Sequence, residues 1–211
     1  MQTRFLKMTQ AISKPEAFGL TDETNIAICF QCLAAYNEGT HHYFWCDLEK
    51  LYSSDDDLED FRIKFAECEK YLIETSPAFG AEEIFFTDHQ GIESIYSEYI
   101  DYKEVFEYLE QRELVAKDGK DPAIYELWNS NIGGPCNDRI NDGQTFIDNF
   151  RGIADNGAEF TEEWYRELHN LDSMPSDLTS HIDWQDVWDC ELTHDFTEIR
   201  YKNDLYFFYN D

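Results

Sequence analysis

The chain has 211 residues and a formal net charge of −29, because 45 acidic residues face only 16 basic ones. Its content of 42% hydrophobic and 16% aromatic residues is enough for packed cores, which excludes a disordered acidic chain. Nucleic acid is nearly excluded as a partner, since binding to phosphates requires clustered Lys and Arg.

The sequence has no run of about eighteen apolar residues and no N-terminal basic segment followed by an apolar core. We therefore expect a cytoplasmic protein. Its six cysteines are widely spaced, which is typical of reduced thiols. Cys29 and Cys32 have the spacing of half a zinc site or a redox pair, but on a strand this spacing places them on opposite faces. Buried structural thiols are the favoured interpretation.

The first part of the chain predicts an arm and a β-hairpin. Residues 1–24 contain Gly, Pro, Ser and Thr without clear periodicity, which indicates a flexible or loosely docked arm. The apolar run at 26–36 is typical of a buried strand, residues 37–40 of a turn, and residues 42–47 of a second strand.

A helix and a third strand follow. Ser53 and Ser54 offer a helix cap, the aspartates after them suit the positive end of the helix dipole, and an apolar stripe runs from Leu58 to Leu72. Residues 83–89 have the pattern of a third strand. Together these elements predict a small unit of three strands and a helix with an acidic outer face.

The middle of the chain predicts helices and loops. Residues 92–114 are helical in character, with acidic residues on the outside. Residues 116–151 are less acidic, with turns at 133–135 and 141–143 and a short helix at 122–130.

The last section predicts two helices and a hairpin. Thr161 is expected to cap the first helix and Asp183 to open the second, with a break at 174–176 between them. Residues 196–201 and 205–209 form the strands of the predicted hairpin.

One segment approximates a calcium loop. Residues 138–149 have a glycine, Gly143, at the sixth position, where an EF-hand loop requires one. Ile140, however, occupies a ligand position, and Asn149 replaces the bidentate Glu. The segment therefore argues against an EF-hand.

An alternative function is a metal-dependent nucleic-acid hydrolase that uses Asp88, Asp101 and Lys103. An Asp followed at a distance by an acid-x-Lys pattern is the sequence motif of such sites. Asp101, however, lies in a predicted helix and not beside the strand end that carries Asp88. No phosphate-binding loop, nucleophile elbow or HExxH motif is present. We therefore expect a protein that is not an enzyme and has no cofactor or metal.

The distribution of charge favours a binding protein. Residues 152–199 hold thirteen carboxylates and a single basic side chain, Arg166, among many aromatic residues, which indicates a folded acidic surface. A homodimer would carry twice −29, the charge of about 29 base pairs of duplex DNA. Carboxylates on helix faces have regular spacing and can imitate a track of phosphates, so the target would be a protein with a basic DNA-binding groove. The open alternative is a generic acidic adaptor that binds basic proteins.

Several short motifs occur along the chain at suitable distances. They are Ala34-Ala35-Tyr36-Asn37-Glu38-Gly39, Trp45-Cys46-Asp47-Leu48, FTDHQG at 86–91, Glu162-Glu163-Trp164-Tyr165, Met174-Pro175-Ser176-Asp177-Leu178, His181-Ile182-Asp183-Trp184 and Trp188-Asp189-Cys190-Glu191-Leu192. In these motifs and their order, the chain resembles the ArdA antirestriction proteins over most of 25–115 and 145–209.

The resemblance implies an α+β fold, an elongated and curved chain of three small domains that forms a homodimer through its C-terminal domain. It also implies a mimic of bent B-form DNA. Such a mimic occupies the DNA-binding groove of type I restriction-modification enzymes, at the methyltransferase core of specificity and modification subunits. It blocks restriction and often modification, in the cytoplasm of a bacterial host, and an origin on a mobile element is implied as well.

The resemblance also suggests a division of the chain. We expect an N-terminal arm (1–24), an N-terminal α/β domain (25–91), a mainly helical central domain with an insertion (92–144) and a C-terminal α/β domain with the dimer interface (145–211). The insertion, about 117–144, is less acidic than the rest. The antirestriction segment of the family corresponds to about 166–178.

The predicted site consists of carboxylates that would take the place of phosphates. They are Asp55, Asp56, Asp57, Glu59, Asp60, Glu98, Asp101, Glu104, Glu107, Glu162, Glu163, Glu167, Asp172, Asp177, Asp186, Asp189 and Glu191. The resemblance places the dimer interface beside the antirestriction segment. Its predicted residues are Leu168, Leu171, Met174, Pro175 and Leu178.

Overall fold

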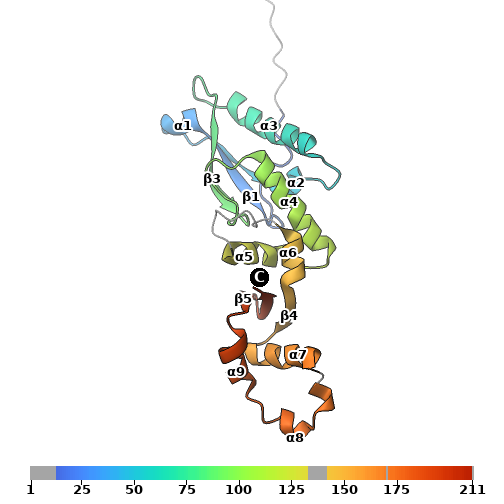
Figure 1. Cartoon of the computed structure of the whole chain (residues 1–211). Helices are drawn as coiled ribbons and strands as arrows, with labels where there is room; N and C mark the ends of the chain where they lie inside the picture. The colour runs from blue at the N-terminus through green and yellow to red at the C-terminus, as the bar shows by residue number, and fades with distance from the viewer. Residues whose placement is uncertain (1–12, 133–141, 170, 211) are drawn as a thin grey trace, which may run out of the picture. The chain divides into compact units, whose positions relative to one another are not determined.

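The computed structural model describes residues 13–132, 142–169 and 171–210. Contacts divide the chain into two units, Met1–Glu110 and Gln111–Asp211, and the division falls within helix α4 (Tyr102–Lys117). Each unit contains one small antiparallel sheet with helices packed against it (Figure 1). The mixed α and β class predicted from the sequence is confirmed, whereas the division into three domains stays a prediction.

The first unit is built on a three-stranded sheet in the order β2-β1-β3. Its strands are β1 (Ala27–Cys32), β2 (Tyr43–Asp47) and β3 (Ile84–Gln90). All three strands are confirmed, but the run predicted as one strand to residue 36 ends early. Helix α1 (Leu33–Asn37) takes its last residues. Leu33-Ala34-Ala35 consists of strong helix formers, which explains the change.

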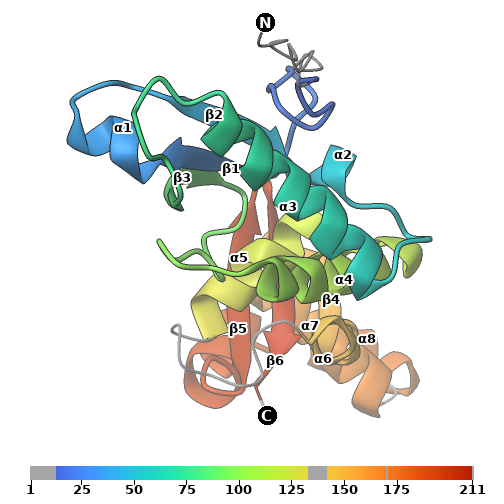
Figure 2. The same ribbon diagram turned by 90° about the horizontal axis from the view of Figure 1, so that it is seen from above.

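Two helices of the first unit pack against the sheet. Helix α2 (Leu48–Leu51) is short, and α3 (Leu58–Glu74) is the predicted helix. Phe65 of α3 packs on Phe30 of β1 with ring centroids 5.1 Å apart. Phe61, near the start of α3, packs on Phe106 of α4 at 5.4 Å, and Figure 2 shows this end of α3 lying over α4. The burial of this aromatic cluster holds the helices to the sheet.

The helix predicted for 92–114 begins later than expected. Residues 92–101 form turns, and α4 starts at Tyr102. Oδ1 of Asp101 accepts hydrogen bonds from the backbone N–H groups of Lys103 and Glu104, and Oε2 of Glu104 accepts from the N–H of Asp101. This reciprocal capping box fixes the start of the helix. The preceding residues are largely Ser, Ile and Tyr, which are weaker helix formers.

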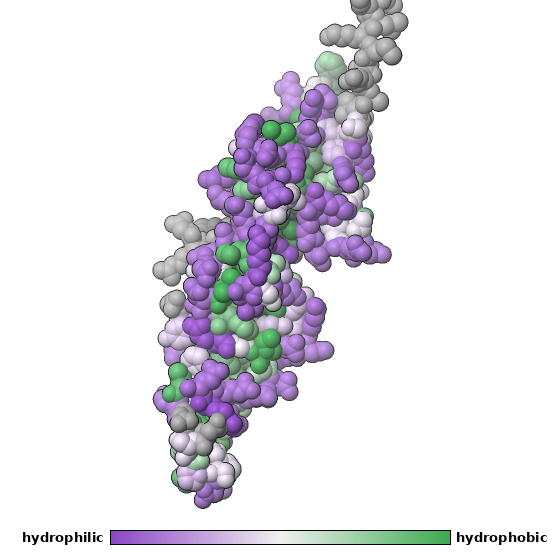
Figure 3. Space-filling view, turned by 90° about the vertical axis from the view of Figure 1, so that its right-hand side faces the viewer, coloured by the Kyte–Doolittle hydropathy of each residue, from purple (hydrophilic) through white to green (hydrophobic). Residues whose placement is uncertain are grey.

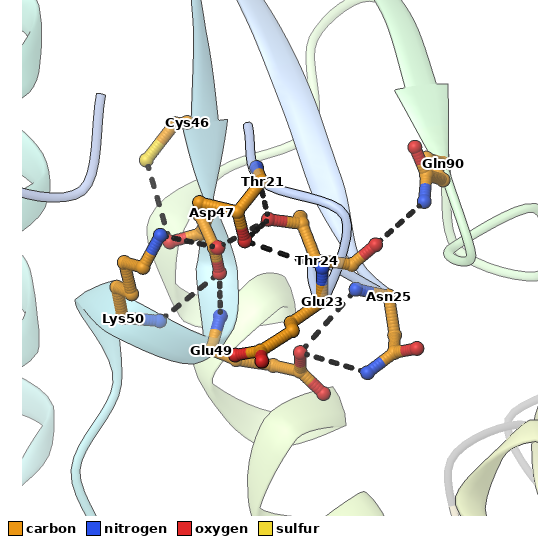
Figure 4. Close-up of polar contacts among 9 residues, drawn as sticks. All are labelled: Thr21, Glu23, Thr24, Asn25, Cys46, Asp47, Glu49, Lys50 and Gln90. Carbon is orange, nitrogen blue, oxygen red and sulfur yellow. Dashed lines mark hydrogen bonds and ion pairs between the residues drawn. The ribbon is translucent and has the colours of Figure 1, made fainter. Parts of the chain in front are cut away.

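The segment before β1 packs into the first unit. Phe18 is 5% exposed, stacks on Phe44 and forms a bridge with Cys46 at the edge of β2. Thr24 donates a hydrogen bond to the buried carboxylate of Asp47, as Figure 4 shows. These contacts dock residues 17–24 on the sheet; residues 1–12 of the expected arm lie outside the described residues.

The second unit has a sheet in the order β4-β6-β5. Its strands are β4 (Phe150–Ala154), β5 (Phe196–Tyr201) and β6 (Asp204–Tyr209). The hairpin of β5 and β6 is confirmed, and its turn consists of Lys202 and Asn203, with φ of 56° at Lys202. Strand β4 is absent from the sequence prediction, which placed loops around it.

Helices cover both faces of the second sheet (Figure 1). Helices α5 (Pro122–Ile132) and α6 (Gly143–Asn149) lie on one face, where Phe146 packs 5.1 Å from Phe208. Helix α7 (Gly157–His169) lies on the other, where Phe160 stacks 4.1 Å from Phe207. Adjacent residues on β6 point to opposite faces, so Phe207 and Phe208 anchor the two layers.

Helix α7 begins four residues before the predicted cap. Oδ1 of Asn156 accepts a hydrogen bond from the N–H of Glu159, and Oε2 of Glu159 accepts from the N–H of Asp155. Thr161 is fully buried inside the helix, and its hydroxyl donates to the carbonyl oxygen of Gly157. The prediction that Thr161 caps this helix is wrong, because Asn156 supplies the cap.

Short helical segments complete the second unit. They are η1 (Leu171–Ser173), α8 (Ser176–Thr179), α9 (Trp184–Val187) and the π-helical η2 (Trp188–Leu192). Asp183 caps α9 as predicted, since its Oδ1 accepts from the N–H of Asp186. Trp188 lies over the start of α7 and is 4% exposed.

The cysteines fit the prediction of reduced thiols. Cys29, Cys32, Cys46 and Cys68 are free and buried in the first unit, whereas Cys190 is free and exposed. Cys136 lies outside the described residues. No helix in the described part of the chain is long and apolar enough to cross a membrane.

Candidate functional site

Each unit has its own candidate site residues, which are carboxylates on or beside its helices. On the face drawn in Figure 3, hydrophilic residues cover most of the surface of both units, with smaller hydrophobic areas among them. Some of these carboxylates pair with a Lys or Arg side chain or cap a helix, whereas others do neither among the described residues.

The carboxylates before and at the start of α3 have three different roles. Oδ1 of Asp57 accepts from the N–H groups of Glu59 and Asp60, each at 2.9 Å, so Asp57 is the N-cap of α3 in place of the predicted serines. Asp55 and Asp60 are exposed, and neither forms an ion pair among the described residues. The charges of Asp55 and Asp60 are thus available to a partner.

Two other carboxylates of this group are neutralised locally. Asp56 is half-buried and pairs with Lys64. Glu59 receives two hydrogen bonds from Arg62, one of them from Nε at 2.7 Å, and this pairing lowers the pKa of Glu59. The charges of these two side chains are compensated within the chain, because each has its own counter-charge.

The outer face of α3 carries two carboxylates that the sequence prediction missed. Asp60, Glu67 and Glu74 are all exposed and follow one another at intervals of seven residues. Seven residues are nearly two helical turns, or about 10.5 Å along the axis. This seven-residue spacing is visible in the sequence and could have identified Glu67 and Glu74 as members of the same helix face.

The carboxylates around α4 are mostly engaged in helix structure. Asp101 and Glu104 form the capping box, and Glu107 pairs with Lys103 at 3.4 Å. Glu98 is exposed, and only its backbone carbonyl is engaged, by the N–H of Phe86. Of the four predicted residues in this region, Glu98 alone has neither a capping role nor an ion pair in the described part of the chain.

Helix α7 presents a regular pair of carboxylates. Glu163 and Glu167 are exposed and lie four residues apart, which is about 6 Å along the helix axis. Successive phosphates on one DNA strand rise about 3.4 Å each, so this spacing approximates two nucleotides. Glu162 differs, because Arg166 donates to it at 2.7 Å.

The segment of α9 and η2 concentrates negative charge around a thiol. Asp186, Asp189 and Glu191 are exposed, and the Sγ of Cys190 lies 3.8 Å from Oδ1 of Asp186. The charge of Asp186 is the main cause of a raised pKa of the Cys190 thiol, with smaller contributions from Asp189 and Glu191. All three carboxylates therefore contribute to a negative electrostatic potential at the Cys190 thiol.

The remaining predicted carboxylates lie between α7 and α9. Asp177 is exposed in the first turn of α8. The side chain of Asp172 lies outside the described part of the chain.

The predicted dimer residues divide into exposed and buried ones. Leu168, Met174 and Leu178 are 56%, 41% and 54% exposed, and Pro175 is exposed as well. Leu171 is only 8% exposed and packs inside its own unit. A pocket of about 250 Å³ lies beside them. It is lined by Glu162, Arg166, Leu171, Met174, Ser176, Thr179 and Trp184.

The residues of the hydrolase alternative have local structural roles. Asp101 caps α4, and Lys103 pairs with Glu107 on the same helix. Oδ1 of Asp88, on β3, accepts a hydrogen bond from the N–H of His89. Among the described residues, no group of three or more His, Cys, Asp or Glu side chains is arranged to hold a metal ion.

The segment resembling a calcium loop is helical where it is described. Residues 138–141 lie outside the described residues, but Asp142 caps α6 through Gln144 and Thr145, and Gly143 is the first residue of that helix. The hydroxyl of Thr145 also lowers the pKa of Asp142 through a hydrogen bond. These contacts are those of a helix start.

Comparison with known proteins identifies a family. The model of the family described as antirestriction protein (ArdA) matches residues 28–202, which is most of the chain. No match was found among curated proteins. The family comprises inhibitors of restriction-modification enzymes and is not an enzyme family. The chain belongs to the ArdA family of antirestriction proteins.

Proposed function

We propose that the chain inhibits type I restriction-modification enzymes by presenting carboxylates in place of DNA phosphates. The target surface would be the basic groove in which the specificity and modification subunits hold DNA. Occupation of this groove blocks restriction and also modification, because both reactions require bound DNA.

The observation that carries the proposal is a set of exposed carboxylates that are held at helical spacing and form no ion pair with any described residue. Asp60, Glu67 and Glu74 on α3, and Glu163 and Glu167 on α7, are members of this set. Helix geometry fixes their spacing before binding, so little conformational entropy is lost on association.

The negative potential around Cys190 supports the same proposal. Like charges held close together repel each other, and such an arrangement destabilises the folded chain unless a cationic partner compensates it. A groove lined by Lys and Arg is a partner of that kind.

We also propose that the protein acts as a homodimer. Leu168, Met174 and Leu178 expose apolar surface near α8, and Pro175 adjoins them. Burial of these side chains against a second copy would remove apolar area from water. Leu171 is itself buried within the unit and lines a pocket together with Met174.

Displacement of DNA from a purified type I methyltransferase tests the proposal. Labelled duplex DNA is bound to the enzyme, and the inhibitor is titrated at salt concentrations from about 50 to 300 mM, while the mass of the inhibitor in solution is measured. Electrostatic pairing predicts that the apparent affinity falls steeply as salt rises. Failure of a large excess to displace DNA at low salt, with restriction and methylation unaffected, would refute the proposed function.

The same titration distinguishes a generic acidic adaptor. An adaptor would bind basic proteins without discrimination, and short duplex DNA would not compete for one defined site. A mimic competes with duplex DNA stoichiometrically and leaves unrelated basic proteins unbound at moderate salt.

A further inference from the structure

One end of the first unit carries aromatic side chains that the acidic mimicry does not use. Phe79, in the turn between α3 and β3, is 99% exposed; Tyr36 of α1 is 54% and Tyr43 of β2 is 49% exposed. Tyr36 packs edge-on against the half-buried Phe85 of β3, with ring centroids 5.5 Å apart. We call Tyr36, Tyr43, Phe79 and Phe85 the aromatic surface.

Hydrogen bonds bring the parts of this surface to the same end of the sheet. The Sγ of Cys32, at the end of β1, lies 3.2 Å from the Oγ of Ser76 in the turn after α3. The N–H of Leu33, at the start of α1, donates to the carbonyl oxygen of Glu83. Figure 1 shows α1 and the connection from α3 to β3 at this end of the unit.

The turn that carries Phe79 is fixed on both sides of the ring. The N–H of Ala78 donates to the Oγ of Ser76 at 3.2 Å, and Ala78 is 7% exposed. Gly80 adopts a φ of 70°, which a side chain would disfavour. Phe79 therefore points into solvent from an ordered turn, and its binding to a partner costs little conformational entropy.

A buried amide group on the sheet face of Tyr43 and Phe85 has no acceptor for its N–H among the described residues. Gln31 lies opposite Tyr43 on one neighbouring strand and opposite Phe85 on the other, so the three side chains share one face of the sheet. Gln31 is 5% exposed, and within the described part of the chain its Nε2 has no hydrogen-bond acceptor. A buried donor without an acceptor is unfavourable, and an acceptor from a bound partner would satisfy it.

Charge around the aromatic surface defines the partner. Glu74 precedes the Phe79 turn, Glu82 and Glu83 follow it, and Glu38 ends α1; all four are exposed. A complementary surface has an apolar pocket for an aromatic ring and a rim of Lys or Arg.

We infer that the aromatic surface is a second contact with the restriction-modification enzyme, in which Phe79 enters an apolar pocket rimmed by basic side chains. The inference rests on the proposed function, since it assigns the same partner. This contact differs from the carboxylate contacts in its salt dependence. Salt screens charge pairs, whereas burial of an aromatic ring is insensitive to moderate salt. The aromatic surface is therefore a salt-independent anchor.

Phe79→Ser tests this inference in the full-length protein. We expect the affinity for the type I methyltransferase to fall about tenfold at every salt concentration, as for an aromatic hot spot, with the salt dependence unchanged. Tyr36→Ser should cause a smaller loss of the same kind. Leu20→Ser is the matched control, because Leu20 is 42% exposed and lies outside the aromatic surface; its affinity should equal that of the unmodified chain.

The outcomes separate this inference from the proposed function. If the unmodified chain does not bind the methyltransferase at low salt, the proposed function fails. If it binds and Phe79→Ser binds equally well across the salt series, the anchor is refuted while the proposed function stands. If Phe79→Ser instead lowers the mass of the free inhibitor in solution and leaves enzyme binding intact, the aromatic surface joins two copies of this chain, and the anchor is again refuted.

Discussion

The hydroxyl of Thr24 donates a hydrogen bond of 2.6 Å to Oδ2 of Asp47, whose side chain is almost completely buried. Oδ1 of Asp47 accepts from the N–H groups of Glu49 and Lys50, which begins α2, and Nζ of Lys50 pairs with Oδ2 at 3.1 Å (Figure 4). One carboxylate thus joins the segment before β1, the end of β2 and the start of α2.

Thr24→Val should destabilise the first unit by about 1–2 kcal/mol, because a buried charged acceptor loses one of its donors. Hydrogen–deuterium exchange of the β1 and β2 amides measures the loss. Thr40→Val is the control, since Thr40 is exposed and its hydroxyl forms no hydrogen bond with a residue that the structure describes. Equal exchange in the two variants would show that the Thr24 hydroxyl contributes nothing.

Gly157→Ala should destabilise the second unit, although alanine normally stabilises a helix. A Cβ at Gly157 would lie 2.6 Å from ring atoms of Trp188. Trp188 is held by Phe160 and Phe207 and cannot move aside without disturbing the core. We expect a net loss of about 1–2 kcal/mol, in which overpacking outweighs the gain in helix propensity.

Urea unfolding followed by tryptophan fluorescence measures this loss. Ala158→Gly, at the adjacent position of α7, is the control and should cost roughly 1 kcal/mol through helix propensity alone. It should leave the emission of the folded protein unchanged, whereas Gly157→Ala should shift it. A Gly157→Ala protein that is as stable as the unmodified chain would contradict the packing of Trp188.

Neutralisation of unpaired carboxylates should affect inhibition more than neutralisation of a paired one. Glu163→Gln with Glu167→Gln removes two exposed charges, so binding to the methyltransferase should weaken several-fold at low salt and its salt dependence should become shallower. Glu162→Gln removes a charge that Arg166 already compensates, so it should weaken binding less. DNA displacement at two salt concentrations compares the variants, and equal effects per charge would refute the distinction.

The Cys190 thiol should react slowly and respond to its acidic neighbours. Because the charge of Asp186 raises its pKa, less thiolate is present at a given pH, and alkylation by iodoacetamide should require a higher pH than for an ordinary cysteine. Asp186→Asn should move the pH profile of the alkylation rate to lower pH. Added salt should raise the alkylation rate of Cys190 more in the unmodified protein than in the variant. Peptide mass spectrometry quantifies the reaction at Cys190, and identical profiles would exclude a local negative potential.

The elements with regular periodicity were predictable from the sequence. Helix α3 follows from its apolar stripe, and the β5–β6 hairpin follows from two strand patterns around a short turn. The Asp183 cap was recognisable because an Asp before an apolar helix face is a strong start signal.

Other elements depend on tertiary contacts that the sequence does not display. Strand β4 is short and contains Arg151 and Gly152, so pairing with β6 and packing against α7 decide its conformation. Helix α6 had a usable signal in Asp142, which caps it, but the surrounding glycines and asparagines indicated a loop. Thr161 resembles an N-cap because Glu residues follow it. The actual N-cap of α7 is Asn156, five residues earlier, whose side chain accepts from the N–H of Glu159.

The predicted site was recognisable only as a set of acidic residues. Which carboxylates are compensated depends on the side-chain pairs Asp56–Lys64, Glu59–Arg62 and Glu162–Arg166. Two of these have helical spacing and could have been inferred, but the first joins a turn to a helix eight residues later. The aromatic surface was missed because its members are scattered in sequence and meet only through the fold.

The position of Phe18 sets a practical limit on how the chain can be shortened. The family match begins at residue 28, whereas the folded first unit already includes Phe18, which lies ten residues earlier and covers the edge of β2. A recombinant fragment cut to the matched region would expose backbone N–H and C=O groups of that edge together with the faces of Phe44 and Tyr71. An uncovered edge of this kind is a template for aggregation. Soluble expression of the first unit therefore requires a start point upstream of Ala17.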